Sequence, residues 1–230
     1  MFAAVFAVGA IALSFLVTCT SATAAQQSYV YAIIHPVYGE IGTFTRTTHQ
    51  VANTTTINSQ LRVAIKLLGA VVYREDADGA ETLRDNRLVS FQNITQTNGT
   101  RMEVRGESHG NTFVVSSPSG TVTAPADVAP SDPWFVRPTG PRDMVSTKTG
   151  KVVHARVSDG ARTTISFNGV SIPARHFTIV SDNRQDVWLD SHDVPIMFRT
   201  EVDGTPIDFF LRSPIEASVF TSDHNQASAE

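Results

Sequence analysis

The densest group of chemically capable side chains lies near the C-terminal end of the sequence. Its members are four aspartates and one histidine: Asp182, Asp186, Asp190, His192 and Asp193. Carboxylates and imidazole can ligate a metal ion or transfer protons in general acid–base catalysis. A calcium loop, however, has closer oxygen-ligand spacing and a glycine, which this segment lacks. Asp-Ser-His-Asp is also ordinary turn chemistry. A hydrolase with its site at residues 186–193 is therefore the weakest of our three functional hypotheses, and we predict no metal site.

Other sequence signals also fail to indicate catalysis. No two histidines have the i, i+4 spacing that a helical zinc motif needs, and no glycine-rich phosphate loop is present. The single cysteine, Cys19, lies in the N-terminal segment. We expect a protein that is not an enzyme, with no catalytic residue and no cofactor.

Length and charge exclude further classes. The 230 residues suit a single all-β domain, and the formal net charge is −4. Nucleic-acid binders usually carry a basic stripe, whereas the 18 Lys and Arg residues of this chain are scattered. We therefore expect no nucleic-acid partner, and we expect a monomer.

The first 24 residues resemble a secretory signal peptide. Residues 2–17 are uncharged and almost wholly apolar, and Ala22-Thr23-Ala24 matches the small-x-small pattern that precedes cleavage. The apolar stretch is short for a membrane span. We predict export to the periplasm or beyond, with cleavage after Ala24 or Ala25. We expect Cys19 to leave with the signal peptide rather than carry a lipid anchor.

The rest of the chain reads as strands and turns. Residues 28–37 are rich in β-branched and aromatic types, and residues 61–68 alternate between apolar and polar. Asn98-Gly99 and Asp203-Gly204 are typical of tight hairpin turns. We expect Gly69 to bend a continuing strand, residues 75–79 to form a charged turn, and no helix.

One segment interrupts this pattern. Residues 125–141, the proline-rich loop, hold Trp134 and Phe135 among five prolines: Pro125, Pro130, Pro133, Pro138 and Pro141. Proline removes a ladder hydrogen bond and breaks helices, so the segment is predicted to cross between two sets of strands. Loops of this length are often functional.

Together these signals predict an all-β fold. We expect one curved antiparallel meander sheet, forming a partial, open β-barrel over residues 25–212. The polar residues 213–230 are expected to form a disordered tail.

The order of several short motifs resembles a known family. These motifs are Gly39-Glu40-Ile41-Gly42, Asp85-Asn86-Arg87-Leu88, Thr97-Asn98-Gly99-Thr100, Thr149-Gly150-Lys151-Val152, the segment 170–177 and Asp186-Val187-Trp188-Leu189-Asp190. Their order is similar to that of bacterial exported proteins classed as domain of unknown function 6134. The resemblance covers residues 28–211. It implies a periplasmic half-barrel, similar in outline to envelope lipoprotein carriers, and it implies no catalytic residue.

Our first functional hypothesis is a groove on the concave face of the sheet, closed by the proline-rich loop. Such a groove would bind an apolar or lipid-like ligand. The predicted ligand-binding residues are Trp134, Phe135, Ile65, Leu67, Phe91, Trp188 and Phe198. The second hypothesis is an envelope interaction or scaffold module in which the same apolar face is a filled core.

Overall fold

A computed structural model describes residues 25–167 and 169–216 of the chain. The predicted signal peptide, residues 1–24, lies outside the described residues, and so do residues 217–230 of the predicted tail. All regular structure within the described ranges is β-strand, as the alternating apolar pattern predicts. None of the described segments is a helix long and apolar enough to span a membrane.

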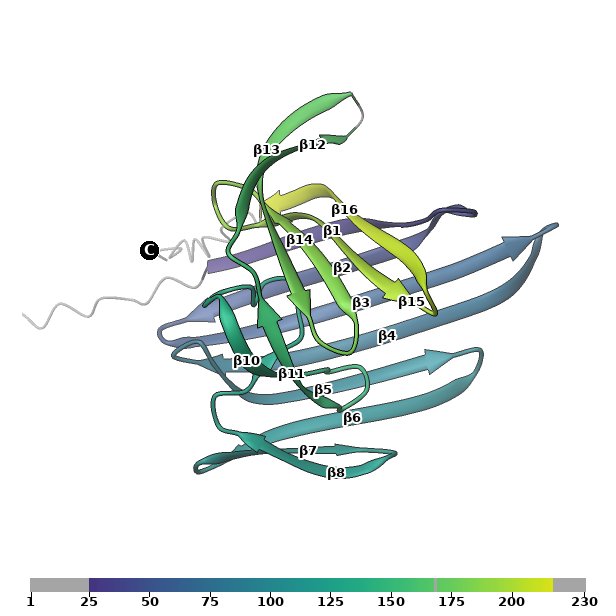
Figure 1. Ribbon diagram of the computed structural model, residues 1–230. Helices are drawn as coiled ribbons and strands as arrows, with labels where there is room; N and C mark the ends of the chain where they lie inside the picture. The colour runs from purple at the N-terminus through teal and green to yellow at the C-terminus, as the bar shows by residue number, and fades with distance from the viewer. Residues whose placement is uncertain (1–24, 168, 217–230) are drawn as a thin grey trace, which may run out of the picture.

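The N-terminal half forms eight strands joined by tight turns. Their bounds are β1 (Ala25–His35), β2 (Gly39–Val51), β3 (Thr54–Leu67), β4 (Ala70–Arg84), β5 (Arg87–Thr97), β6 (Thr100–His109), β7 (Thr112–Ser117) and β8 (Gly120–Pro125). Each pairs antiparallel with the next, which makes a simple meander. Figure 1 shows β2 to β6 as long, nearly parallel ribbons that form one broad curved surface.

The C-terminal half adds eight shorter strands. Their bounds are β9 (Ala129–Pro130), β10 (Gly140–Val145), β11 (Val152–Val157), β12 (Ala161–Phe167), β13 (Val170–Val180), β14 (Arg184–Leu189), β15 (Pro195–Val202) and β16 (Thr205–Glu216). β16 pairs with β1, so both halves belong to one sheet, running from β8 through β1 and β16 to β9. Only β9 pairs in parallel, with β10, among the described strands.

The sheet curls over itself without closing, which confirms the predicted open barrel. In Figure 1 the C-terminal strands cross in front of β2 to β5. Side chains at the turn between β10 and β11 reach the opposite wall, because Lys148 forms an ion pair with Glu75 of β4 at 2.6 Å. Gly150 of the same turn lies against Val104 and Val115 of β6 and β7.

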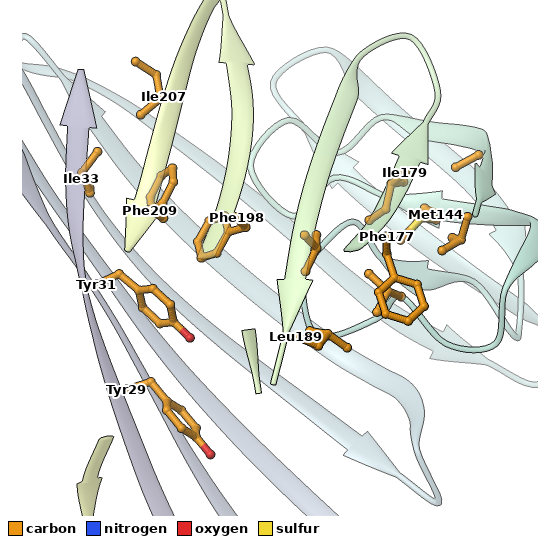
Figure 2. Close-up of a cluster of buried hydrophobic side chains, with 14 of the residues drawn as sticks. Tyr29, Tyr31, Ile33, Met144, Phe177, Ile179, Leu189, Phe198, Ile207 and Phe209 are labelled. Carbon is orange, nitrogen blue, oxygen red and sulfur yellow. The ribbon is translucent and has the colours of Figure 1, made fainter. Parts of the chain in front are cut away.

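The concave face carries two apolar clusters. The larger joins β1 and β2 to the C-terminal strands, and Figure 2 shows Tyr29 and Tyr31 projecting from β1 on the same side as Phe198 and Phe209. The smaller packs Val145 of β10 and Val128 onto β5 to β8, with Phe91 and Phe113 stacked at its centre. Side-chain period two explains both clusters, since alternate residues of each strand face inward.

The hairpin predictions at Asn98-Gly99 and Asp203-Gly204 are confirmed, with positive φ at all four residues. Two other expectations are wrong. Leu68 and Gly69 do not bend a continuing strand but form a tight turn between β3 and β4, with φ of 51° and 85°. Residues 75–79, expected as a charged turn, lie in the middle of β4, because their partners on β3 and β5 supply a complete ladder.

The proline-rich loop connects β8 to β10 as predicted, with only the two-residue β9 inside it. At the other end of the chain, β16 continues to Glu216, past the boundary at 212 that we expected. Its pairing with β1 holds residues 213–216 in the sheet.

Candidate functional site

Trp134 of the proline-rich loop sits on the concave face against an aromatic group. Its ring centroid lies 6.2 Å from Tyr29, 5.7 Å from Tyr31 and 6.4 Å from Phe44. Phe198 of β15 completes the group at 6.2 Å. Aromatic pairs at these separations attract each other in tilted and edge-on arrangements, so Trp134 packs firmly against the concave face.

A buried ion pair links the proline-rich loop, which carries Trp134, to the sheet. Arg46 of β2 donates from Nη1 to Asp132 Oδ2 at 2.5 Å, and Arg46 is only 2% exposed. The Arg46 guanidinium also lies over the Trp134 ring, 4.3 Å from its centroid. Asp132 Oδ1 accepts the Trp134 backbone N–H at 2.9 Å, so one carboxylate both shapes the turn and anchors it.

A second carboxylate lies next to this pair. Glu81 of β4 is 7% exposed. Burial, and then the negative charge of Asp132, raise the pKa of Glu81 to about 7, against the lowering effect of Arg46. Neither Glu81 Oε2 nor Arg46 Nε has a hydrogen-bond partner among the described residues. Buried polar atoms without hydrogen-bond partners are uncommon. Stability alone therefore does not explain why charged residues occupy these buried positions.

Small residues on neighbouring strands leave room for the long Arg46 side chain. Arg46 pairs with Ser59 of β3, which pairs with Gly79 of β4, so all three positions share the concave face. A Cβ at Gly79 would lie 2.5 Å from Ser59 Oγ. Small residues therefore occupy the inward positions that are in register with Arg46 on β3 and β4.

A pocket of about 560 Å³ lies on the other side of the proline-rich loop, between that loop and the turn from β4 to β5. Its lining combines apolar and cationic side chains: Asn86, Arg87, Leu88, Asp127, Val128, Ala129, Pro130, Trp134, Phe135, Arg137, Pro138 and Arg142. Trp134 thus forms a wall of this pocket and also contacts the aromatic group on the concave face.

Three arginines contribute to the lining of this pocket. Arg142 Nη1 donates to the carbonyls of Phe135 and Arg137, and burial lowers the pKa of Arg142. Arg137 forms an ion pair with Asp193 at 3.1 Å. Arg87 is exposed and makes no ion pair with any residue that the structure describes. The pocket is therefore cationic, with Asp127 as the one carboxylate in its lining.

Some of the predicted ligand-binding residues gather here. Trp134, Phe135 and Phe198 all belong to the larger apolar cluster, and Ile65 packs against it from β3. Trp134 and Phe135 also line the pocket. These four residues come together because the proline-rich loop folds into the concave face.

The other three predicted residues lie apart. Leu67 is 46% exposed near the turn between β3 and β4, and Phe91 belongs to the smaller cluster. Trp188 lies on the face opposite to Val187 and stacks on His176 at 4.6 Å. The predicted position of Trp188 on the concave face was wrong, because the buried Val187 and Leu189 take the inward positions of β14.

The acidic segment does not assemble one site. Asp190 accepts two backbone N–H groups and closes the turn after β14, while Asp193 pairs with Arg175 and Arg137. Asp186 belongs to a cross-strand ladder on the convex face. Burial raises the pKa of Asp186, but hydrogen bonds from Arg184, His176 and Thr178 outweigh it and hold that pKa at about 2. Asp186, Asp190 and Asp193 thus each have a separate structural role.

The sequence also contains one Gly-x-Ser-x-Gly pattern, at residues 106–110, so the expectation that no such pattern is present was wrong. A nucleophile elbow needs a turn from strand to helix, whereas Ser108 lies in β6 beside Phe113 of β7. His109 and Glu107 flank Ser108 on its strand, so they point to the opposite face. The described residues contain no group of three or more His, Cys, Asp or Glu side chains able to hold a metal ion.

Comparisons with known proteins agree with this architecture. A family model described as Domain of unknown function (DUF6134) matches residues 38–212. The chain belongs to this family. The motif order had predicted the same DUF6134 membership. No curated protein matches the chain.

A solved structure shares the fold of this DUF6134 protein. It is described as the crystal structure of a beta-barrel-like protein of domain of unknown function DUF1849 from Brucella abortus. The two align with a TM-score of 0.64 over 86% of this chain and 100% of the other, at 8% identity. The likeness shows the barrel-like fold alone.

Sequence reasoning about the DUF6134 chain missed Arg46, Glu81 and Asp132. A usable signal existed, because Arg46 shares strand parity with Phe44, and Glu81 shares it with Leu83. A charged residue at a position where strand alternation turns side chains inward indicates one of two things. Either the strand assignment is wrong, or the charged group is buried. Only the fold shows that the two residues lie on one face, two strands apart.

Proposed function

We propose that this protein is an exported, non-enzymatic binding protein for a lipid-like ligand with an anionic head group. The observation that carries the proposal is the pocket beside the proline-rich loop, in which an aromatic and aliphatic wall faces three arginines. Its volume of about 560 Å³ falls in the range typical of small-molecule sites, roughly 300–1,000 Å³.

The chemistry of the lining favours an amphiphile over a purely polar or purely apolar ligand. Trp134, Phe135 and Leu88 offer apolar surface to a hydrocarbon chain. Arg87 offers an unpaired guanidinium, whose planar fork of donors suits a carboxylate or a phosphate. Arg142 is held rigidly by backbone carbonyls, so its charge adds a fixed positive field.

Export rests on the sequence. The apolar stretch at residues 2–17 and the Ala22-Thr23-Ala24 pattern support secretion, which would place the protein in the periplasm of a bacterium. A carrier or sensor of envelope lipids fits that compartment.

Binding of cis-parinaric acid, a fluorescent fatty acid, tests the proposal. We expect Trp134→Ala and Phe135→Ala to weaken binding at least tenfold, because each removes one wall of the pocket. Trp188→Ala is the matched control, since Trp188 lies on the far side of the sheet and its loss leaves the pocket intact. Equal affinity in all three variants would refute the pocket as the binding site.

The head-group preference needs its own comparison. The methyl ester of the same fatty acid carries no charge, so it should bind less tightly than the acid. Arg87→Gln should remove that difference while leaving ester binding unchanged. An acid preference that survives in Arg87→Gln would show that this arginine does not recognise the head group.

The second candidate is an envelope interaction or scaffold module. It is favoured by the filled concave face, where Trp134 occupies the space that a ligand of the sheet itself would need. If neither the acid nor its ester binds, this second candidate gains support.

A further inference from the structure

We propose that Glu81 is a reserve counter-ion for Arg46: when the proline-rich loop lifts, Glu81 replaces Asp132 as the partner of Arg46, and Trp134 leaves the concave face. The exchange would control access to the ligand site. That last step rests on the function proposed above, whereas the exchange itself does not.

The first observation is an excess of carboxylates around one cation. Arg46 is bonded to Asp132, yet within the part of the chain that the structure describes its Nε has no partner, and Glu81 Oε2 has none either. Both side chains are more than nine-tenths buried and lie on the same face of the sheet. A donor and an acceptor are therefore both free, in a place where unpaired polar atoms are costly.

The second observation is the way the loop is attached. Its hydrogen bonds lead mostly to β10: Ser131 N–H donates to the Val145 carbonyl, and Arg142 of β10 binds the carbonyls of Phe135 and Arg137. The ion pair from Asp132 to Arg46 links the loop to the opposite wall, which β2 forms. Arg137, further along the loop, also pairs with Asp193 in the turn after β14. Breaking the Arg46 pair would therefore free the segment around Asp132 and Trp134, while the loop stays attached at β10 and at Arg137.

A lifted loop would leave Arg46 buried without a partner, and an unpaired buried charge is strongly destabilising. Glu81 belongs to β4 and stays with the sheet when the loop moves. Its carboxylate lies close enough to Arg46 for the two charges to interact in the closed state. Glu81 thus supplies the counter-charge that the open state requires.

The exchange moves a proton. In the closed state, burial and Asp132 raise the pKa of Glu81, so its carboxyl holds a proton up to near-neutral pH. In the open state Asp132 has left and Arg46 faces Glu81 directly, which lowers that pKa. Opening therefore releases one proton, and a rise in pH favours the open state.

Other charged or titratable groups also face this cluster. Asp190, in the turn after β14, acts on Tyr29 and Tyr31 of β1, whose pKa values are raised mainly by burial. Neither phenol ionises near neutral pH. Asp190 keeps its structural hydrogen bonds in the turn, so Glu81 is the group poised to titrate.

The consequence for the ligand site follows from the position of Trp134. On one side it lines the pocket, and on the other it covers Tyr29, Tyr31 and Phe44. Its departure would join the pocket to the aromatic surface of the sheet. A long hydrocarbon chain would then find a continuous apolar path.

Tryptophan fluorescence of the purified protein tests the exchange. Trp188→Phe leaves Trp134 as the only indole of the chain, so the emission of this variant reports on Trp134 alone. We expect the Trp134 emission of this variant to shift to longer wavelength as pH rises from 5 to 9, because the raised pKa of Glu81 places its ionisation within this range.

Three further substitutions in the Trp188→Phe background decide the outcome. Glu81→Gln should abolish the shift and keep the short-wavelength emission, because an amide cannot neutralise Arg46. Asp132→Asn should give the long wavelength throughout. Glu107→Gln, at an exposed carboxylate of β6, should behave like the parent. Far-ultraviolet circular dichroism confirms that each variant is folded.

A transition that persists in Glu81→Gln, or a parent whose emission does not change between pH 5 and 9, overturns the exchange. Asp132→Asn gives an independent result, since unchanged short-wavelength emission in that variant also contradicts the mechanism. Parinaric acid binding reports separately on the proposed function. A protein that shows the transition but binds no fatty acid would keep the exchange and refute the ligand.

Discussion

Replacing Glu81 with glutamine should stabilise the protein, and only above acidic pH. Glutamine has nearly the same shape as glutamate and stays neutral. In the folded protein the Glu81 carboxyl resists ionisation, because it is buried and lies near Asp132. The unfolded chain ionises it freely, so deprotonation favours unfolding.

The size of the effect follows from the two pKa values. The pKa rises from 4.5 to about 7 on folding, and a tenfold change in proton affinity is worth about 1.4 kcal/mol, so the ionised carboxylate costs up to ~3 kcal/mol. A raised carboxyl pKa means that the folded state binds more protons between these values. Stability therefore falls as pH rises from about 4.5 to 7 and is constant above that window.

Urea unfolding at pH 4.5, 6 and 8 measures this difference. We expect Glu81→Gln and the parent to have similar unfolding free energies at pH 4.5, with the variant more stable by up to ~3 kcal/mol at pH 8. Glu107→Gln is a suitable control, since Glu107 is exposed on β6. If Glu81→Gln is equally or less stable at pH 8, the assignment of a neutral buried carboxyl is refuted.

Three further substitutions test the packing. Tyr31→Phe should destabilise the protein by ~1 kcal/mol in urea unfolding, because it removes a buried hydrogen bond of 2.7 Å to the Pro195 carbonyl. Gly106→Ala should lower the melting temperature at a cost of ~1–3 kcal/mol, since its methyl group would collide with the Phe91 ring. In the parent, the lowered pKa of Asp186 stabilises the fold above about pH 4, and this stabilisation is lost as pH falls from about 4 to 2. Asp186→Asn should remove this part of the pH dependence.

Local patterns predicted most of the fold. Alternation and turn residues such as Asp203-Gly204 act within a few positions, so the meander and the open barrel could be read directly. Residues 75–79 show where this fails. Acidic residues and a glycine are typical of turns, but here Glu75 pairs with Lys148 from across the barrel and Gly79 makes room for the Ser59 side chain. Such causes lie outside the local sequence.

The candidate site was predicted only in part. The prolines identified the loop, and their position made Trp134 and Phe135 conspicuous. Nothing local indicated that Asp132 would meet Arg46, since the two are brought together by the curl of the whole sheet. The face on which Trp188 lies was predicted wrongly, because an aromatic residue is compatible with either face of a strand. Only the burial of Val187 and Leu189 shows which face of β14 points inward.

The pairing of β1 with β16 has a consequence for how the chain folds. These strands lie at opposite ends of the described sequence yet are neighbours in the middle of the sheet. The meander from β1 to β8 can form from local contacts alone, but closing the central seam requires nearly the entire chain and a large loss of loop entropy. Until β16 pairs with β1, the backbone N–H and C=O groups along that edge of β1 have no strand partner, which makes the chain prone to aggregation. β16, the last of the described strands to be synthesised, therefore completes the structure and also protects it.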